Sequence, residues 1–233
     1  MKPSSHALHL PRVIVLASGK GGVGKSTLVR SLAAHWLSVG QTPAIVDADP
    51  QASIVSLHDA EGLMAKVTVV ADPEVETIKS TIDDLAARHS IVLVDTAGFR
   101  NQTTIMACIS ADTVVIPLKP AAEDAREALA MLDLINELNA TPERTRAPID
   151  ARLVMTMVTP GTLIARQVRK ELEKGGYPIL ETDVMQRVAF PELSMRGLAP
   201  SIVDPDGSAA RNIAAVATEL GKSGSTNRVV QAA

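Results

Sequence analysis

The stretch VIVLASGKGGVGKSTLVRSL at residues 13–32 decides the fold, because an apolar run leads through a glycine-rich loop into a helical pattern. The letters GKGGVGKS at 19–26 satisfy the phosphate-binding pattern G-x-x-x-x-G-K-[ST] in the strand–loop–helix context that it requires. Glycines let successive backbone N–H groups point at phosphate oxygens, and the start of the following helix adds further donors. Lys25 would bridge the β- and γ-phosphates, and the Ser26 hydroxyl would bind Mg²⁺.

The composition limits the possible functions. Of 233 residues, 46% are hydrophobic and 21% charged, as is typical of a soluble globular protein. A formal net charge of −3 argues against a general polyanion-coating role, and 2% aromatic residues argue against a base-stacking surface. Cys108 is the only cysteine, so no internal disulfide is expected and a cytoplasmic location is the default. No apolar run approaches the roughly 18 residues of a membrane-spanning helix, and we expect no membrane partner.

Short apolar segments rich in β-branched residues alternate with helical patterns. The expected strands are 12–18, 43–48, 66–71, 90–96, 112–118 and 151–158. The expected helices are 25–39, 74–88, 102–109, 121–139, 162–174 and 208–221. We predict an α/β fold with a doubly wound, mostly parallel sheet of about seven to eight strands flanked by helices, as in P-loop NTPases. One P-loop domain is expected over 12–221, between flexible tails at 1–11 and 222–233.

The expected strand at 90–96 carries an acidic residue near its end, at the edge where α/β sheets present their ligand groups. In IVLVDTAG at 91–98, Asp95 is expected to hold Mg²⁺ through water or beside Ser26. Gly98 would let the backbone approach the γ-phosphate and act as the pivot of a switch segment. The alternative for Asp95 is a strand-end acid in an ordinary turn.

The letters KGGVGKST at 20–27 resemble the deviant Walker A motif of the ParA/MinD family of P-loop ATPases, in which an additional lysine precedes the glycine pair. The resemblance implies that Lys20 reaches across a nucleotide-sandwich homodimer to the phosphates of the partner subunit. Such a cation would stabilise the transferring phosphoryl group and make turnover depend on dimerisation. The alternative is a solvated loop lysine. The loop residues expected to bind ATP are Gly19, Lys20, Gly21, Gly22, Val23, Gly24, Lys25, Ser26 and Thr27.

The stretch IVDADPQ at 45–51 resembles the second motif of this family, D-x-D-P-Q. The resemblance implies that Asp49 orients or polarises the attacking water, whereas Asp47 supports the Mg²⁺ shell. The alternative for both is a structural role, as a turn residue or helix N-cap. The expected catalytic residues are Lys20, Lys25 and Asp49, and the expected Mg²⁺ ligands are Ser26, Asp47 and Asp95.

The sequence says less about the choice of base. In VMTMVTP at 154–160, Thr156 occupies a place at which family members often carry an asparagine that reads the base edge. The stretch IVDPDGSAA at 202–210 resembles the late loop that packs on adenine, with Pro205 as the candidate contact. The family implies ATP rather than GTP, and the guanine-reading sequence N-K-x-D is absent.

The resemblance extends from residue 13 to about 221 and is strongest to the small ParA type, which lacks an N-terminal helix-turn-helix region. It implies an ATPase with ATP and Mg²⁺ as cofactors, whose ATP-bound homodimer binds DNA without sequence preference and is therefore associated with the nucleoid. A ParB-like or cargo-adaptor protein would stimulate hydrolysis and release the dimer. The cargo would be a plasmid, a chromosomal locus or a protein assembly.

Non-specific DNA binding would need a basic surface and would depend strongly on salt. Residues 166–174 place several basic side chains on one face of an expected helix. The alternative is an ordinary solvated face, balanced by Glu171 and Glu173. The candidate DNA contacts are Arg187, Arg196, Arg166, Arg169 and Lys170.

Two other functions stay open as alternatives. A ligase of the dethiobiotin-synthetase type would use the same loop with a small-molecule pocket and would not need DNA. A MinD-like membrane-cycling ATPase would end in a basic amphipathic helix, but STNRVVQAA at 225–233 has one arginine and a brief apolar pair. An iron–sulfur carrier needs paired cysteines, and a bacterial tyrosine kinase of the related type has a tyrosine-rich tail, whereas this chain has one cysteine and one tyrosine.

Overall fold

The computed structural model describes residues 13–57, 62–98, 101–142, 144–145 and 147–222. Within them, six strands form one sheet in the order β3-β2-β4-β1-β5-β6, and every neighbouring pair is parallel. The strands are β1 (Val13–Ser18), β2 (Pro43–Ala48), β3 (Thr68–Ala71), β4 (Ile91–Gly98), β5 (Thr113–Leu118) and β6 (Asp150–Met155). Because β1 lies between β4 and β5, the loop that follows it emerges near the middle of the sheet.

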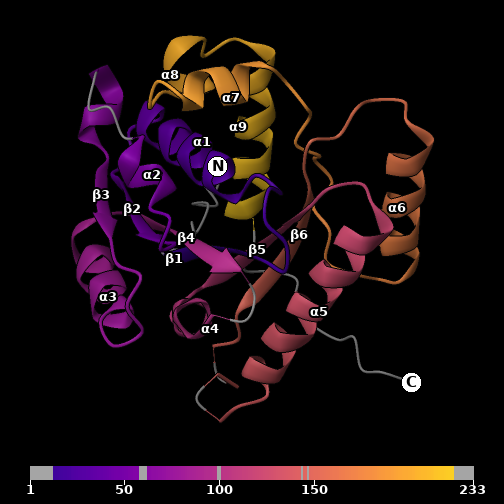
Figure 1. Cartoon of the computed structure of the whole chain (residues 1–233), viewed down its shortest axis with the longest axis horizontal. Helices are drawn as coiled ribbons and strands as arrows, with labels where there is room; N and C mark the ends of the chain where they lie inside the picture. Colours follow the sequence, from indigo (N-terminus) through magenta and orange to yellow (C-terminus); the bar gives the residue numbers. More distant parts are fainter. Residues whose placement is uncertain (1–12, 58–61, 99–100, 143, 146, 223–233) are drawn as a thin grey trace, which may run out of the picture.

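Helices cover both faces of this sheet (Figure 1). One face carries α1 (Lys25–Ser38), α2 (Ser53–Ser56), the short 3-10 helix Gly62–Lys66, α7 (Ala189–Ser194), α8 (Pro200–Val203) and α9 (Ser208–Gly221). The other face carries α3 (Ile78–Arg88), α4 (Gln102–Ile109), α5 (Ala122–Asn139) and α6 (Leu163–Lys174). The arrangement is therefore the doubly wound one that the alternating sequence pattern predicts.

Alternate residues of each strand point to opposite faces and build two separate apolar clusters. In β1, Ile14 and Leu16 belong to the cluster beneath α1 and α9, whereas Val13 and Val15 belong to the cluster beneath α3, α4 and α5. All four side chains are buried. Burial on both faces explains why the strand segments are continuously apolar rather than alternating.

The prediction of seven to eight strands is wrong for the described residues, in which the sheet has six. The segment 178–186 lies beside β6 but pairs with it only through isolated bridges. These bridges are Leu153–Ile179 and Val158–Met185. The backbone N–H of Leu180 donates to the carbonyl of Leu153, and the next such bond joins the N–H of Val184 to the carbonyl of Met155. The segment thus uses four residues where β6 uses two. Because the two backbones fall out of step, they cannot form the continuous ladder of a seventh strand.

The predicted division into one domain and two tails stays a prediction, because residues 1–12 and 223–233 lie outside the described residues. Among the helices that the structure describes, none combines the length and the hydrophobicity needed to span a membrane.

Candidate nucleotide-binding site

The glycine-rich loop joins β1 to α1 with a backbone that only glycine adopts easily. Gly22 and Gly24 have φ angles of +71° and +88°, in the left-handed region. Gly24 is the N-cap of α1 and has no side chain that could accept hydrogen bonds from the helix. The first turn of α1 has no acidic residue either. The first N–H groups of α1 are therefore available to an anion, at the positive end of the helix dipole.

A cavity of about 500 Å³ opens over this loop, and we call it the phosphate cavity. Its lining comes from the loop, the start of α1, the segment after β2 and the ends of β4 and β6. The lining residues are Gly21, Gly22, Gly24, Lys25, Ser26, Thr27, Asp49, Gln51, Ser53, Ala97, Gly98 and Met157. Most of the residues that the sequence assigns to ATP and catalysis thus share one cavity. Gly19, Lys20 and Val23, also assigned to ATP, do not line it.

Lys25 is held at the loop by a short chain of hydrogen bonds. Its Nζ donates to Ser18 Oγ at 3.1 Å, and Ser18 Oγ donates to the backbone carbonyl of Lys20 at 2.8 Å. These bonds keep the ammonium group at the phosphate cavity, where it can exchange its hydroxyl partner for phosphate oxygens.

Thr156, at the place where family members often carry asparagine, directs its hydroxyl to the backbone of the phosphate-binding loop. Its side chain is buried, and Oγ1 lies 2.8 Å from the carbonyl oxygen of Val23 and 3.2 Å from that of Leu118. A hydroxyl has one proton to donate, so it serves these two carbonyls in turn or as a shared donor. Thr156 therefore ties the end of β6 to the phosphate-binding loop.

Asp95 has the surroundings expected of a metal ligand. Its side chain is fully buried at the end of β4, and neither carboxylate oxygen has a hydrogen-bond partner among the described residues. Burial raises the pKa of this carboxyl group to about 7, although the nearby Ser26 hydroxyl and Lys25 ammonium act in the opposite direction. An unpartnered buried carboxylate beside a hydroxyl is a donor set that Mg²⁺ prefers, so the residues present fit the ion.

Asp47 lies beside Asp95 in the sheet register, but its oxygens are already in use. Oδ2 accepts hydrogen bonds from the backbone N–H groups of Ile54 at 2.8 Å and Val55 at 3.0 Å, in the first turn of α2. Oδ1 lies 3.4 Å from the backbone nitrogen of Asp49. Asp47 thus has a structural role, as the sequence left open, although it satisfies the start of α2 from within β2 and the N-cap residue of that helix is Ala52. Its support of the Mg²⁺ shell stays a prediction.

Asp49 enters the phosphate cavity from the turn after β2. Its Oδ1 accepts a hydrogen bond from the backbone N–H of Gln51 at 2.9 Å, which fixes the carboxylate, and the side chain is half-buried. Gly98 lines the same cavity from the end of β4, and an added methyl group there would meet no atom within 4 Å. The cavity therefore brings together an anchored carboxylate, a lysine and an open stretch of backbone.

Lys20 points away from the phosphate cavity toward the start of α5. Its Nζ lies 2.9 Å from Glu123 Oε2 and 3.3 Å from Asp124 Oδ1. The hydrogen bond that Lys20 donates to Glu123 raises the pKa of Lys20 most, and the bond to Asp124 raises it further. Gly19 is glycine for a reason of packing, because a Cβ there would lie 2.7 Å from Glu127 Oε2 and 2.9 Å from Glu127 Cβ. Gly19 and Lys20 thus both face α5.

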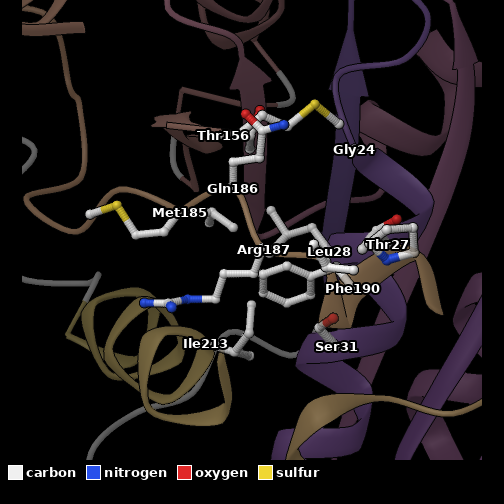
Figure 2. A pocket seen from close by; sticks show the side chains of 14 residues that line it. Gly24, Thr27, Leu28, Ser31, Thr156, Met185, Gln186, Arg187, Phe190 and Ile213 are labelled. Carbon is white, nitrogen blue, oxygen red and sulfur yellow. The ribbon is translucent and has the colours of Figure 1, made fainter. Parts of the chain in front are cut away.

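A second cavity of about 350 Å³, which we call the base cavity, adjoins the first and shares Gly24, Thr27 and Met157 with it (Figure 2). Its walls are mostly apolar and come from α1, α7, α9, the end of β6 and the segment before α7. The remaining lining residues are Leu28, Ser31, Thr156, Val184, Met185, Gln186, Arg187, Val188, Phe190, Pro191 and Ile213. An apolar slot that opens into a phosphate cavity has the shape and chemistry to take a nucleoside.

Several residues that line the two cavities were not identified from the sequence, among them Phe190, Gln186 and Met157. Phe190 forms part of the apolar wall, and Figure 2 shows the side chain of Gln186 reaching toward Thr156 and Gly24. Met157 has a φ of +53°, which is uncommon for a residue with a side chain. Only tertiary packing brings Phe190 and Gln186 to the loop. Pro205, the predicted adenine contact, is exposed and lines neither of these cavities.

The five candidate DNA contacts lie in different surroundings. Arg166, Lys170 and Arg196 are all exposed at the surface. Arg169 is half-buried, and its guanidinium contacts Asp183, Glu173 and the carbonyl oxygen of Leu180. Arg187 lines the base cavity with its stem, and Figure 2 shows its guanidinium on the side away from Thr27 and Ser31. The first three are therefore the better placed for a macromolecular partner.

Comparison with known proteins agrees with this geometry. A family model described as the CobQ/CobB/MinD/ParA nucleotide binding domain matches residues 14–201. The chain belongs to this family. Protein ParA of Rhizobium radiobacter is 30% identical over 187 residues, covering 79% of this chain and 83% of that protein. The maintenance of carboxysome distribution protein A of Gloeobacter kilaueensis is 31% identical over 201 residues, covering 85% of this chain and 87% of that protein.

A solved member of the MinD/ParA family has the same fold. The septum site-determining protein MinD of Pyrococcus horikoshii, in complex with Mg-ADP, superposes with a TM-score of 0.70 at 14% identity. The match covers 90% of this chain and 95% of that one.

Proposed function

We propose that this chain is an ATPase whose ATP-bound homodimer binds DNA without sequence preference and positions a plasmid, a chromosomal locus or a protein cargo over the nucleoid. A ParB-like or cargo-adaptor protein stimulates hydrolysis and so returns the dimer to monomers. The relative named for the maintenance of carboxysome distribution supports this proposal. The observation that carries it is the position of Lys20, which lies outside the phosphate cavity of its own chain.

The residues around the phosphate cavity have distinct roles in this proposal. The loop N–H groups and Lys25 bind the β- and γ-phosphates, and Asp49 orients the attacking water. Ser26 and Asp95 hold Mg²⁺, which neutralises charge on the phosphate oxygens when it is bound. The base cavity takes the nucleoside, with the amide of Gln186 as a hydrogen-bonding group for the purine edge.

Lys20 is suited to act on the nucleotide of a partner subunit. Its carboxylate partners are on the same chain, and the side chains of Lys20 and Glu123 are 37% and 77% exposed. The pair with Glu123 is open to water and therefore weak, so phosphate oxygens of a second subunit can replace it at little cost. Asp124 is 5% exposed, and it keeps the hydrogen bond from the backbone N–H of Lys119 when Lys20 leaves. The exchange would place a cation against the transferring phosphoryl group only in the dimer.

Mixing two inactive variants tests this arrangement. Lys20→Ala should bind ATP within about twofold of the wild type yet lose about a thousandfold or more in hydrolysis, as loss of an arginine finger does. Asp49→Ala should also bind without hydrolysing. A one-to-one mixture should recover up to about a quarter of wild-type turnover, because half of the dimers pair an intact site with an intact Lys20.

Failure of the mixture to recover turnover would place Lys20 in its own site and would contradict the proposal. Lys79→Ala is the matched control, because Lys79 is an exposed lysine on α3 paired with Asp83.

Lys25→Ala should lose nucleotide affinity altogether. Unchanged affinity in that variant would overturn the assignment of the loop.

The ligase alternative predicts a different response to DNA. In the proposed function, ATP with Mg²⁺ increases retention on duplex DNA of arbitrary sequence, and added salt reverses it. A ligase of the dethiobiotin-synthetase type would show no change in DNA affinity with ATP at low salt. Retention on anionic vesicles but not on DNA would instead favour the membrane-cycling alternative.

A further inference from the structure

Helix α7 forms a wall of the base cavity although little holds it in place. It has six residues, of which only Phe190 is buried. Val188, before it, and Met195, after it, are 69% and 78% exposed. A helix this short is not stable alone, and one buried side chain gives it little support. Phe190 (Figure 2) and Pro191 line the base cavity, so the shape of that cavity depends on whatever fixes α7.

A buried arginine of α1 supplies such an anchor. Arg30 is 3% exposed, and its Nη1 donates to the carbonyl oxygen and to the hydroxyl of Ser194, both at 2.7 Å. Ser194 is the last residue of α7. A cation that hydrogen-bonds the last carbonyl groups is favourable at this end of a helix. One side chain thus connects α1, which carries Lys25 and Ser26, with the wall of the base cavity that α7 forms.

The cost of burying this guanidinium indicates a specific task. Nε is buried without a hydrogen-bond partner among the described residues. Burial lowers the pKa of Arg30, and the charges of Asp95 and Asp47 only partly oppose that effect. A buried donor without a partner costs free energy that an apolar side chain of similar length would not. Neighbours of Arg30 in α1, such as Val29 and Leu32, are apolar and fully buried.

We propose that Arg30 is a positioning residue that fixes α7 against α1 and thereby keeps the base cavity formed. This inference rests on the proposed nucleotide site and deepens it. Arg30 lines neither cavity, so it acts through Ser194 and α7. The phosphate-binding loop has its own supports, Ser18 and Thr156, which do not involve Arg30. Loss of Arg30 should therefore weaken binding of the nucleoside part and spare the phosphates.

Two probes separate these contributions in the full chain. Calorimetry with Mg²⁺ should compare ATP with inorganic triphosphate, which has no nucleoside. Arg30→Met should weaken ATP binding about tenfold or more and leave triphosphate within about twofold, because only the wall of the base cavity moves. Arg30→Lys should recover part of the ATP affinity, since an ammonium can still donate to the carbonyl of Ser194. Arg88→Met, an exposed arginine at the end of α3, is the matched control and should change neither.

Ser194→Ala removes one of the two acceptors and tests the same bridge with little risk to folding. It should weaken ATP binding a few-fold, again without affecting triphosphate. Equal losses for both probes, or no loss for either in Arg30→Met, would overturn the inference. If Arg30→Met does not fold, an unchanged ATP-to-triphosphate ratio in Ser194→Ala overturns it. A wild-type chain that binds triphosphate but shows no preference for ATP would refute the proposed nucleotide site instead.

Discussion

Asp95 combines two properties that compete in the nucleotide-free protein. It is buried without a hydrogen-bond partner among the described residues, which disfavours its charge, yet a charged carboxylate is what a Mg²⁺ site needs. Its pKa rises from 3.8 to about 7 on folding, so between those pH values the folded state binds more protons than the unfolded state. The free energy of unfolding should therefore fall as pH rises through this window.

Asp95→Asn should remove that slope, because an amide does not titrate. Above pH 7 the nucleotide-free variant should be more stable than the wild type by up to about 4 kcal/mol, and it should lose Mg²⁺-dependent nucleotide affinity. Urea unfolding at pH 5 and pH 8, with calorimetry for binding, measures both. A variant as pH-sensitive as the wild type would show that another group carries the slope.

Single residues also show what the sequence alone can predict of a site. Lys25 and Ser26 belong to a contiguous motif, and the structure places them in one cavity as that motif requires. Asp47 also fits a motif, but its hydrogen bonds to the start of α2 depend on a helix of four residues that has no periodicity of its own. Gln186 lies far along the chain from the loop, so no local pattern could have assigned it to the cavity.

Elements with a strong period were predicted well, and irregular ones were not. The expected helices 162–174 and 208–221 agree with α6 and α9 to within one residue, because both repeat apolar residues at helical spacing over two or more turns. The short helices α2 and α8 have too few residues for a period. The surplus strands in the prediction came from the general expectation for a P-loop sheet, and the segment 178–186 approaches that position without forming a ladder.

The end of β6 should control how firmly the phosphate-binding loop is held. Thr156→Val keeps the shape of the side chain but removes the hydroxyl 2.8 Å from the carbonyl of Val23. That carbonyl would then have no hydroxyl donor, at a cost of about 1–2 kcal/mol of stability. A looser loop should bind both ATP and inorganic triphosphate several-fold more weakly, in contrast to the Arg30 variants.

Calorimetry with the two probes, beside thermal unfolding, checks this difference. Thr145→Val is a suitable control, because Thr145 is an exposed threonine between α5 and β6 that lines neither cavity and whose hydroxyl donates to the backbone carbonyl of Thr141. Its substitution should leave triphosphate binding unchanged. Selective loss of ATP binding in Thr156→Val would mean that the hydroxyl serves the base cavity rather than the loop.

For the whole molecule, a net charge of −3 means that any DNA affinity must come from a local surface. Arg166 and Lys170 lie one turn apart on α6, and neither makes an ion pair among the described residues. Arg169, between them, is committed to Asp183 and Glu173. The first two can therefore meet phosphates without disrupting the fold, whereas removing Arg169 would loosen α6.

The double variant Arg166→Ala/Lys170→Ala should weaken ATP-dependent DNA binding equally for unrelated sequences. Removal of one phosphate-binding cation should lower the slope of log affinity against log salt by about 1, so a dimer without these two cations in each subunit should show a decrease of about 4. Titrations over a range of salt concentrations on two unrelated duplexes measure that slope, with Lys79→Ala as the control for removal of an exposed cation.

An unchanged slope would exclude α6 as the DNA-binding surface and direct attention to Arg196. A decrease that depends on the DNA sequence would argue against backbone recognition altogether, because phosphate groups carry no base information.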